Sequence, residues 1–86
     1  MEFEWDEAKR DANLAKHGLD FADVMAVDWA AVTYVPDRRA DYGEDRFRVF
    51  TRIEGELHSL AIVFRGSAIR VLSFRRANRM ERRIYG

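Results

Sequence analysis

The sequence predicts an α+β fold, with an N-terminal αα-hairpin and a C-terminal helix packed on a mostly antiparallel sheet of about four or five strands. Three observations support this prediction. Helix caps and helical apolar spacing are confined to residues 6–29 and 78–85. Apolar–polar alternation with a period of two, broken by Gly and Pro, fills the middle of the chain. A length of 86 residues, 48% of them hydrophobic, predicts one domain, residues 1–86, with a modest core.

The N-terminal segment predicts a short edge strand followed by a helix. Phe3 to Trp5 alternates between apolar and polar residues, and Asp6 is a suitable N-cap for the helix that follows. Gly18, directly after Lys16 and His17, can adopt the left-handed conformation that ends a helix. The expected apolar stripe of this helix consists of three alanines, Ala8, Ala12 and Ala15, and its charged side chains are expected to face water.

A second helix is expected immediately after Gly18. Asp20 is its N-cap, and Leu19 and Val24 occupy the two positions of a hydrophobic staple. The mainly apolar residues that follow extend this helix to about Trp29. Because the turn between the two helices is so short, the sequence predicts an αα-hairpin.

Four further strands are expected in the middle of the chain, at residues 31–35, 46–53, 57–64 and 68–74, with a solvated loop at 36–45 and tight turns at 54–55 and 65–67. Alternation in the second of these places four residues on one face: Arg46, Arg48, Phe50 and Arg52. In the last strand and the residues after it, alternation separates Ile69, Val71, Ser73 and Arg75 from Arg70, Leu72, Phe74 and Arg76.

The final helix is expected to begin near Asn78, which forms a capping-box pattern with Glu81. Met80 and Ile84 lie one turn apart and are expected to pack on the sheet. Arg79, Arg82 and Arg83 form a cationic face on another side of this helix.

Composition excludes several classes of protein. There is no cysteine, which rules out disulfides and thiolate metal sites, and His17 and His58 are the only histidines, so no metal site and no cofactor are expected. No apolar run approaches the length of a membrane span, and the acidic N-terminus lacks the pattern of a secretory signal. We therefore expect a cytoplasmic protein without a membrane partner.

Charge is distributed very unevenly along the chain. Residues 1–45 contain 5 Lys or Arg and 12 Asp or Glu, whereas residues 46–86 contain 10 Arg and 3 Glu. Arg binds phosphate in a bidentate manner and stacks on bases, so an Arg-rich half predicts an anionic partner such as RNA. Phe50, Phe74 and Tyr85 are candidates for stacking on bases. The alternative is that the two halves of the chain pair with each other across the fold.

The sequence also resembles the BrnT family of toxins along nearly its whole length. The N-terminal matches are Phe3 to Lys9, Asn13 and Leu14, Lys16 to Gly18, and Phe21. The later matches are Glu44 to Phe47, Thr51 and Arg52, Arg65 and Gly66, Ile69 and Arg70, Ser73 to Ala77, Glu81 to Arg83, and Tyr85. The resemblance implies a RelE-like fold and a type II toxin that cleaves RNA and blocks translation.

The resemblance also implies partners. It implies a BrnA-like antitoxin that neutralises the toxin and carries a ribbon-helix-helix DNA-binding segment. The toxin–antitoxin complex would bind operator DNA through the antitoxin and repress its own operon. The substrate would be RNA, with mRNA on the ribosome as one candidate.

Metal-independent RNA cleavage needs cations around the phosphorus and a group that transfers protons. The candidates for the first task are Arg52, Arg65, Arg75 and Arg76, and the candidates for binding RNA are Arg46, Arg48, Arg70, Ser73, Arg79, Arg82 and Arg83. His17 and Tyr85 are the proton-transfer candidates, Tyr85 by its likeness to a C-terminal aromatic residue of some RelE-like toxins, and His58 is weaker. Two alternatives remain: a module that binds RNA or the ribosome without cleavage, and a protein whose arginines contact an acidic partner.

Overall fold

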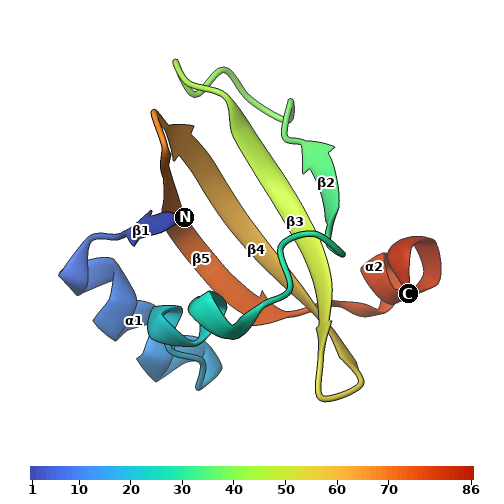
Figure 1. The fold of residues 1–86 in the computed structure, drawn as a ribbon. Helices are drawn as coiled ribbons and strands as arrows, with labels where there is room; N and C mark the ends of the chain where they lie inside the picture. Colours follow the sequence, from blue (N-terminus) through green and yellow to red (C-terminus); the bar gives the residue numbers. More distant parts are fainter.

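The computed structural model describes residues 1–86 and confirms a mixed α+β fold, with one five-stranded sheet flanked by helices (Figure 1). The elements are β1 (Glu2–Glu4), α1 (Glu7–His17), the 3-10 helix η1 (Phe21–Ala26), β2 (Thr33–Pro36), β3 (Arg46–Ile53), β4 (Glu56–Arg65), β5 (Ala68–Arg76) and α2 (Arg79–Tyr85). No helix has the length and apolar character needed to cross a membrane.

The sheet is mixed, with the strand order β1-β5-β4-β3-β2. β2, β3, β4 and β5 pair with their neighbours in antiparallel fashion, whereas β1 pairs in parallel with β5 through Glu2 to Glu4. Alternation in the first residues indicated a strand, but it carried no information about the direction of a partner more than sixty residues later. The prediction of a mostly antiparallel sheet therefore missed the parallel edge.

The predicted αα-hairpin is wrong, because its second member is a 3-10 helix that ends at Ala26. The backbone N–H of Val27 donates to the carbonyl of Val24 over 3.2 Å, a three-residue spacing. Side chains three residues apart eclipse each other in this helix type, so Phe21 and Val24 point to the same side, and both have no exposed surface. The indole N–H of Trp29 donates to the same Val24 carbonyl, so the chain turns away there.

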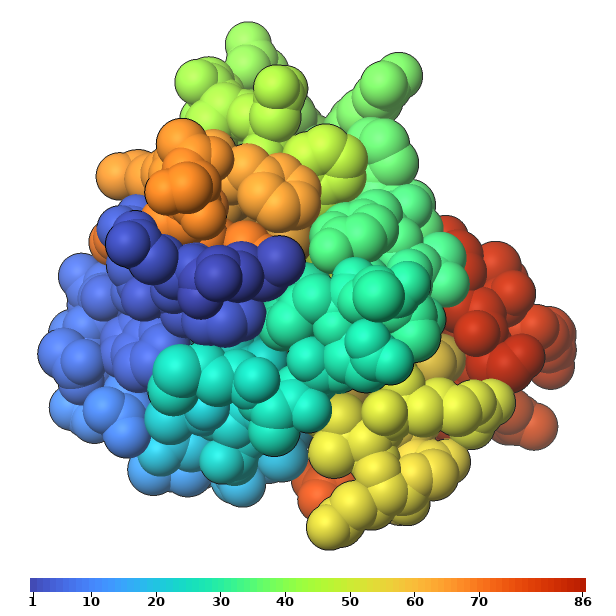
Figure 2. Space-filling view, in the orientation of Figure 1, coloured from blue at the N-terminus to red at the C-terminus, as the bar shows by residue number.

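The main core lies between one face of the sheet and η1. It contains eight buried residues from η1 and the three central strands: Phe21, Val24, Val49, Leu60, Ile62, Ile69, Val71 and Phe74. We call this side of the sheet the core face. In Figure 2, the near side of the molecule is covered mainly by the N-terminal half of the chain, and α2 reaches only the right margin. The acidic half of the sequence therefore covers the core face.

A polar anchor attaches α1 to the sheet. The predicted alanine stripe is wrong, since Ala8, Ala12 and Ala15 are exposed and the one buried residue of α1 is Asn13. The Asn13 amide donates to the Phe74 carbonyl over 2.7 Å and accepts from the Phe74 N–H over 3.0 Å. Because β1 pairs only as far as Arg70, Asn13 supplies at Phe74 the hydrogen bonds that a neighbouring strand would otherwise provide.

A β-bulge changes which residues of β5 share a face. Ser73 pairs with Ala61, but the next residue of β4, Ile62, pairs with Val71, so Leu72 is the extra residue. The predicted grouping is therefore wrong after Val71: Phe74 and Arg76 join Ile69 and Val71 on the core face. The opposite face of β5 carries Arg70, Ser73 and Arg75, and we call this side of the sheet the cationic face.

The terminal helix packs on the cationic face with a rotation that the sequence did not predict. Met80 and Ile84 are 68% and 62% exposed, so the expectation that they pack on the sheet is wrong. Glu81 and Tyr85 face the sheet instead, and the Tyr85 ring stacks on Phe50 with centroids 4.1 Å apart. The orientation of α2 is set by one ion-pairing carboxylate and one aromatic stack.

The Asn13 anchor predicts a large effect of one substitution. Asn13→Ala should lower the free energy of unfolding by about 2–6 kcal/mol, because two buried backbone groups of Phe74 each lose a partner at about 1–3 kcal/mol. Urea denaturation measures this change. Asp11→Ala, on the exposed side of α1, is the matched control and should stay within about 0.5 kcal/mol of the parent protein. Equal effects of the two substitutions would contradict the anchor.

Candidate functional site

The cationic face is organised as rows of side chains across the three central strands. Pairing aligns Arg46, Val63 and Arg70 in the first row, Arg48, Ala61 and Ser73 in the second, and Phe50, Ser59 and Arg75 in the third. The predicted alternation of β3 is thus confirmed. The middle strand contributes only small side chains, Ala61 and Ser59, to the second and third rows. Arg48 and Arg75 stand on the two flanking strands, about 10 Å apart across the sheet for a strand spacing of about 4.8 Å, and they are offset by one row along the strands.

Glu81 of α2 joins these two arginines. Its carboxylate accepts hydrogen bonds from both terminal nitrogens of Arg75, over 2.7 and 3.0 Å, and lies 4.0 Å from Nη1 of Arg48. We call this group the Arg48–Glu81–Arg75 triad. Glu81 is 6% exposed, so the ion pairs are shielded from water. The guanidinium of Arg75 lowers the pKa of the Glu81 carboxyl below its usual value, and Glu81 raises the pKa of Arg75.

The same carboxylate caps α2. The Asn78 side chain accepts from the Glu81 backbone N–H, and the Glu81 carboxylate accepts from the Asn78 backbone N–H, each over 2.9 Å. The predicted capping box is therefore confirmed. Since one carboxylate serves both contacts, formation of the helix and positioning of Arg75 depend on each other.

The triad retains unused donor capacity. A guanidinium has five N–H donors; Glu81 occupies one on each terminal nitrogen of Arg75, and the Arg76 carbonyl accepts a further one from Nη1 over 3.3 Å. The Nε of Arg48 is buried without a hydrogen-bond partner, which is costly unless another group compensates for it. Two cations held 4.0 Å or less from one carboxylate leave a net positive charge at this point.

The end of α1 places His17 beside the triad. Gly18 adopts φ 68° at the helix C-cap, as predicted, so the chain turns away and His17 remains next to β5. His17 shares a shallow pocket with Ser73, the serine of the second row. Burial, and then the positive charges of Lys16 and Arg75, lower the pKa of His17 below its ordinary value of 6.5. The neutral imidazole, which can accept a proton, is therefore the favoured form at neutral pH.

The loop after β2 adds a further cation that sequence reasoning missed. Asp37 is 8% exposed and accepts from Nε and Nη2 of Arg39 over 2.8 and 2.7 Å. This pairing, assisted by a hydrogen bond from the Arg39 backbone, lowers the pKa of Asp37 to about 2. The positive charge of Arg39 acts to lower the pKa of Arg75, and that of Arg48 acts to lower the pKa of Asp37. Arg39 and Asp37 therefore form a charge-balanced pair close to the two arginines of the triad.

Residues 5–81 match the family model described as the ribonuclease toxin BrnT of type II toxin–antitoxin systems. The chain belongs to the BrnT family. This match covers α1, the sheet from β2 to β5 and the triad, and it ends at Glu81. No curated protein matches the chain significantly. Membership implies a ribonuclease toxin that has RNA as its substrate and an antitoxin as its partner.

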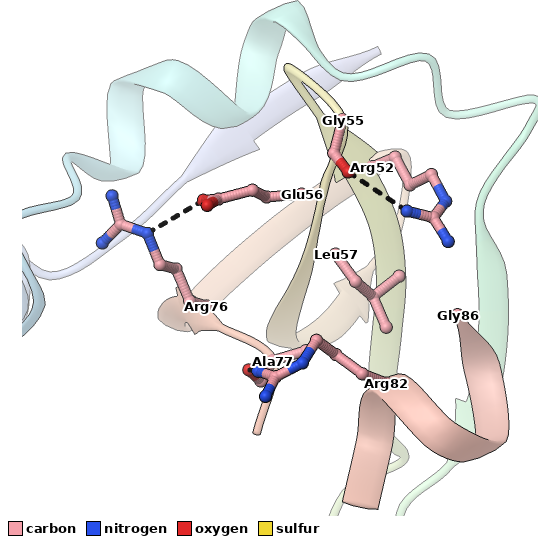
Figure 3. Close-up of a pocket in the computed structure, with 8 residues that line it drawn as sticks. All are labelled: Arg52, Gly55, Glu56, Leu57, Arg76, Ala77, Arg82 and Gly86. Carbon is pink, nitrogen blue, oxygen red and sulfur yellow. Dashed lines mark hydrogen bonds and ion pairs between the residues drawn. The ribbon is translucent and has the colours of Figure 1, made fainter. Parts of the chain in front are cut away.

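Three arginines predicted for the site of this BrnT-family toxin line a pocket of about 310 Å³ and pair with groups other than Glu81, although Arg52 shares the face of β3 with Arg48 (Figure 3). Arg76 pairs with Glu56 over 3.1 Å, Arg52 donates to the Gly55 carbonyl over 3.1 Å, and Arg82 donates to the Ala77 carbonyl over 2.7 Å. Figure 3 shows Arg52 and Arg76 on opposite sides of Leu57, pointing away from each other. The structure therefore does not bring Arg52 or Arg76 together with Arg75.

The other predicted arginines lie at the margins of the cationic face. Arg65 pairs with Glu4 and Glu44, and it lies six residues from Ser59 along β4, or about 20 Å at about 3.4 Å per residue. Arg46 lies over the Tyr42 ring at 4.1 Å, and Arg70 pairs with Glu4 at 3.5 Å. Arg79 and Arg83 are exposed on the outer side of α2 and form no ion pair within the chain.

Two aromatic candidates for base stacking are excluded by burial. Phe74 is 1% exposed in the main core, and Phe50 is 2% exposed beneath Tyr85. His58 is 4% exposed, and its Nδ1 lies 2.8 Å from the Glu56 carbonyl on the core face. Tyr85 remains partly accessible. No group of three or more His, Cys, Asp or Glu side chains is arranged to hold a metal ion.

Glu81 was the residue whose role sequence reasoning recognised only in part. Its spacing from Asn78 predicted the cap. Glu81 is also the one acidic residue among six arginines in residues 69–86, and this pattern indicates an ion pair. The identity of its partner could not be read from the sequence, because the β-bulge at Leu72 decides which arginine faces α2.

The triad predicts a pH-dependent contribution of Glu81 to stability. Glu81→Gln keeps the shape and can still accept from Asn78, but it removes the charge, so the free energy of unfolding near pH 7 should fall by about 1–3 kcal/mol. Because pairing lowers the folded-state pKa, this contribution is present above the ordinary value of 4.5 and is lost as pH falls through the lowered value.

Urea denaturation of both proteins between about pH 7 and pH 3 checks this prediction. The difference between parent and Glu81→Gln should shrink on acidification. A difference that stays constant over this range would show that the charge of Glu81 contributes nothing.

Proposed function

We propose that this BrnT-family toxin cleaves RNA without a metal ion at the cationic face, with the Arg48–Glu81–Arg75 triad binding the scissile phosphate. The observation that carries the proposal is the convergence of two arginines on one buried carboxylate, beside a histidine held in its neutral form. A site of this kind offers fixed positive charge and a proton acceptor on neighbouring elements, which are the two requirements of RNA transesterification.

The reaction follows from these groups. The ribose 2′-oxygen attacks the adjacent phosphorus while His17 accepts the 2′-hydroxyl proton, and the bond to the 5′-oxygen breaks. The products are a 2′,3′-cyclic phosphate and a 5′-hydroxyl end. Arg75 and Arg48 stabilise the additional negative charge that develops on the phosphorane oxygens, and Glu81 keeps Arg75 in position. Tyr85, on the same side of α2 as Glu81, is the candidate donor of the proton to the leaving 5′-oxygen.

The cellular role that we propose follows the family. Cleavage of mRNA, including mRNA on the ribosome, would inhibit translation in the cytoplasm. A BrnA-like antitoxin would neutralise the toxin by covering part of the cationic face. The complex of the two proteins would repress its own operon through the DNA-binding segment of the antitoxin. The family description as a toxin of a type II system supports the existence of such a partner.

The first test separates the triad from the other arginines. Arg75→Ala should lower the cleavage rate of a single-stranded RNA by about 100- to 1,000-fold, the usual cost of losing a preorganised charge-stabilising donor. Arg76→Ala is the matched control, because it removes the same charge from the next residue on the opposite face. Rates are measured with the purified toxin, free of partner, in excess EDTA.

The outcomes of this test discriminate between hypotheses. Equal losses in Arg75→Ala and Arg76→Ala would contradict the proposed site. Cleavage that requires added metal would refute metal independence. A toxin that binds RNA but leaves it intact, even with ribosomes present, would identify a binding module without nuclease activity. A toxin that does not arrest growth when produced alone would contradict the cellular role.

The second test concerns the proton acceptor. If neutral His17 accepts the 2′-hydroxyl proton, kcat/KM should rise with pH through the lowered pKa of His17 and level off below its ordinary value of 6.5. His17→Gln should reduce the rate and remove this acidic limb of the profile. A profile in which the same limb persists in His17→Gln would assign the proton transfer to another residue.

A further inference from the structure

The pocket between α1 and β5 lies outside the triad and contains side chains that the proposed mechanism does not use. It has a volume of about 290 Å³ and is open on one side. α1 contributes Lys9, Ala12, Asn13, Lys16 and His17, and β5 contributes Leu72 and Ser73. The pocket exists because of two features already described: Asn13 holds α1 along the free edge of β5, and the bulge places Leu72 out of the regular pairing.

The two lysines are available to a ligand. Eight of the 15 Lys and Arg residues form ion pairs within the chain, and Lys9 and Lys16 are not among them. Among the nearby carboxylates, Asp20 binds Arg10 in a bidentate manner, whereas Asp6 accepts from the Lys9 backbone N–H and keeps its charge, and Asp11 is exposed. No acidic side chain lines the pocket, so Lys9 and Lys16 make its lining positively charged.

The spacing of the lysines suits an extended anion. Seven residues correspond to nearly two helical turns, so Lys9 and Lys16 lie on one side of α1 about 10 Å apart along the helix axis. Ala12 lies between them and contributes only a methyl group. Leu72, half-buried, gives the pocket an apolar part that can contact a ribose or base. Two separated cations beside an apolar surface fit successive nucleotides of a chain better than they fit a single small anion.

The pocket is continuous with the triad. Ser73 lines the pocket, lies in the same row as Arg48, and stands two residues before Arg75 on the cationic face. His17 lies in the pocket and is also within the electrostatic influence of Arg75. A strand of RNA whose scissile phosphate lies at the triad can therefore continue over Ser73 into the pocket, whose lining contains no acidic side chain.

We propose that the α1–β5 pocket is a phosphate subsite, in which Lys9 and Lys16 bind the backbone of single-stranded RNA next to the scissile position. This inference rests on the proposed function and extends it to residues in the acidic half of the sequence. The subsite contributes affinity for longer RNA, because contacts with phosphate are independent of base sequence.

The test uses the salt dependence of binding to a fluorescently labelled single-stranded RNA of about ten nucleotides, which is long enough to leave the triad. Each phosphate contact on a single strand contributes about 0.7 to the slope of log K against log salt concentration. Lys9→Gln and Lys16→Gln should each reduce the slope by about 0.7, and the double variant by about 1.4. Arg38→Gln, an exposed loop cation that also forms no ion pair, is the charge-matched control and should leave the slope unchanged.

The possible outcomes distinguish this inference from the proposed function. If the parent toxin cleaves RNA but both lysine variants keep the parent's salt-dependence slope, the subsite would be overturned and the proposed nuclease activity would stand. If the parent toxin binds RNA without cleaving it, and the lysine variants still show reduced salt-dependence slopes, the subsite would be supported and the nuclease refuted.

A poly-glutamate peptide provides the control for another kind of partner. If the lysine variants lose affinity for this peptide as steeply as for RNA, the pocket is a general acidic-protein contact and the subsite is overturned. Both lysines are exposed, so the variants should unfold at the same urea concentration as the parent, and a common loss of stability would count against the inference.

Discussion

The buried carboxylate of Glu81 is the interaction on which the site depends. It caps α2, fixes both terminal nitrogens of Arg75 and lies within 4.0 Å of Arg48. Burying a charge is unfavourable unless it is well paired, and here three different elements supply the pairing. A hydrophobic residue at this position could hold α2 on the sheet, but Arg75 and Arg48 would then lack the carboxylate that fixes the orientation of their side chains. The arrangement favours a defined geometry of cations over the greatest possible stability.

The division of the molecule into two faces follows from the charge asymmetry of the chain. Direct pairing of its halves is limited to the ion pairs of Glu4 and Glu44 with Arg46, Arg65 and Arg70. The N-terminal half supplies η1 and most of the cover for the core face, while the strands and α2 supply the cationic face. The acidic residues that do reach the arginines lie at the margins, such as Glu4 beside Arg65 and Arg70. Asp37 lies within electrostatic range of Arg48 but is paired with Arg39, whereas Glu81 is the carboxylate that joins the two arginines of the triad.

Local signals in the sequence predicted local structure well. Three predictions that depend on residues close together in the chain are confirmed: the end of the first helix at Gly18, the capping box of Asn78 and the alternation of β3. The errors arose where a distant partner decides the outcome. The bulge at Leu72 reversed the faces of Phe74 and Arg75, and pairing with Arg75 rotated α2 away from its apolar residues. Arg75 could be proposed from the sequence, whereas its separation from Arg76 could not.

The attachment of α1 by hydrogen bonds and an ion pair, rather than by an apolar stripe, has a consequence for how the protein can change. Hydrogen bonds of Asn13 and the bidentate contact between Arg10 and Asp20 have fixed directions, so they define the rotation of the helix about its own axis. An apolar stripe would permit small slides and rotations. The outward-facing positions of α1 are therefore free to accept substitutions, including ones that meet a new protein partner, without altering where His17 stands relative to Arg75.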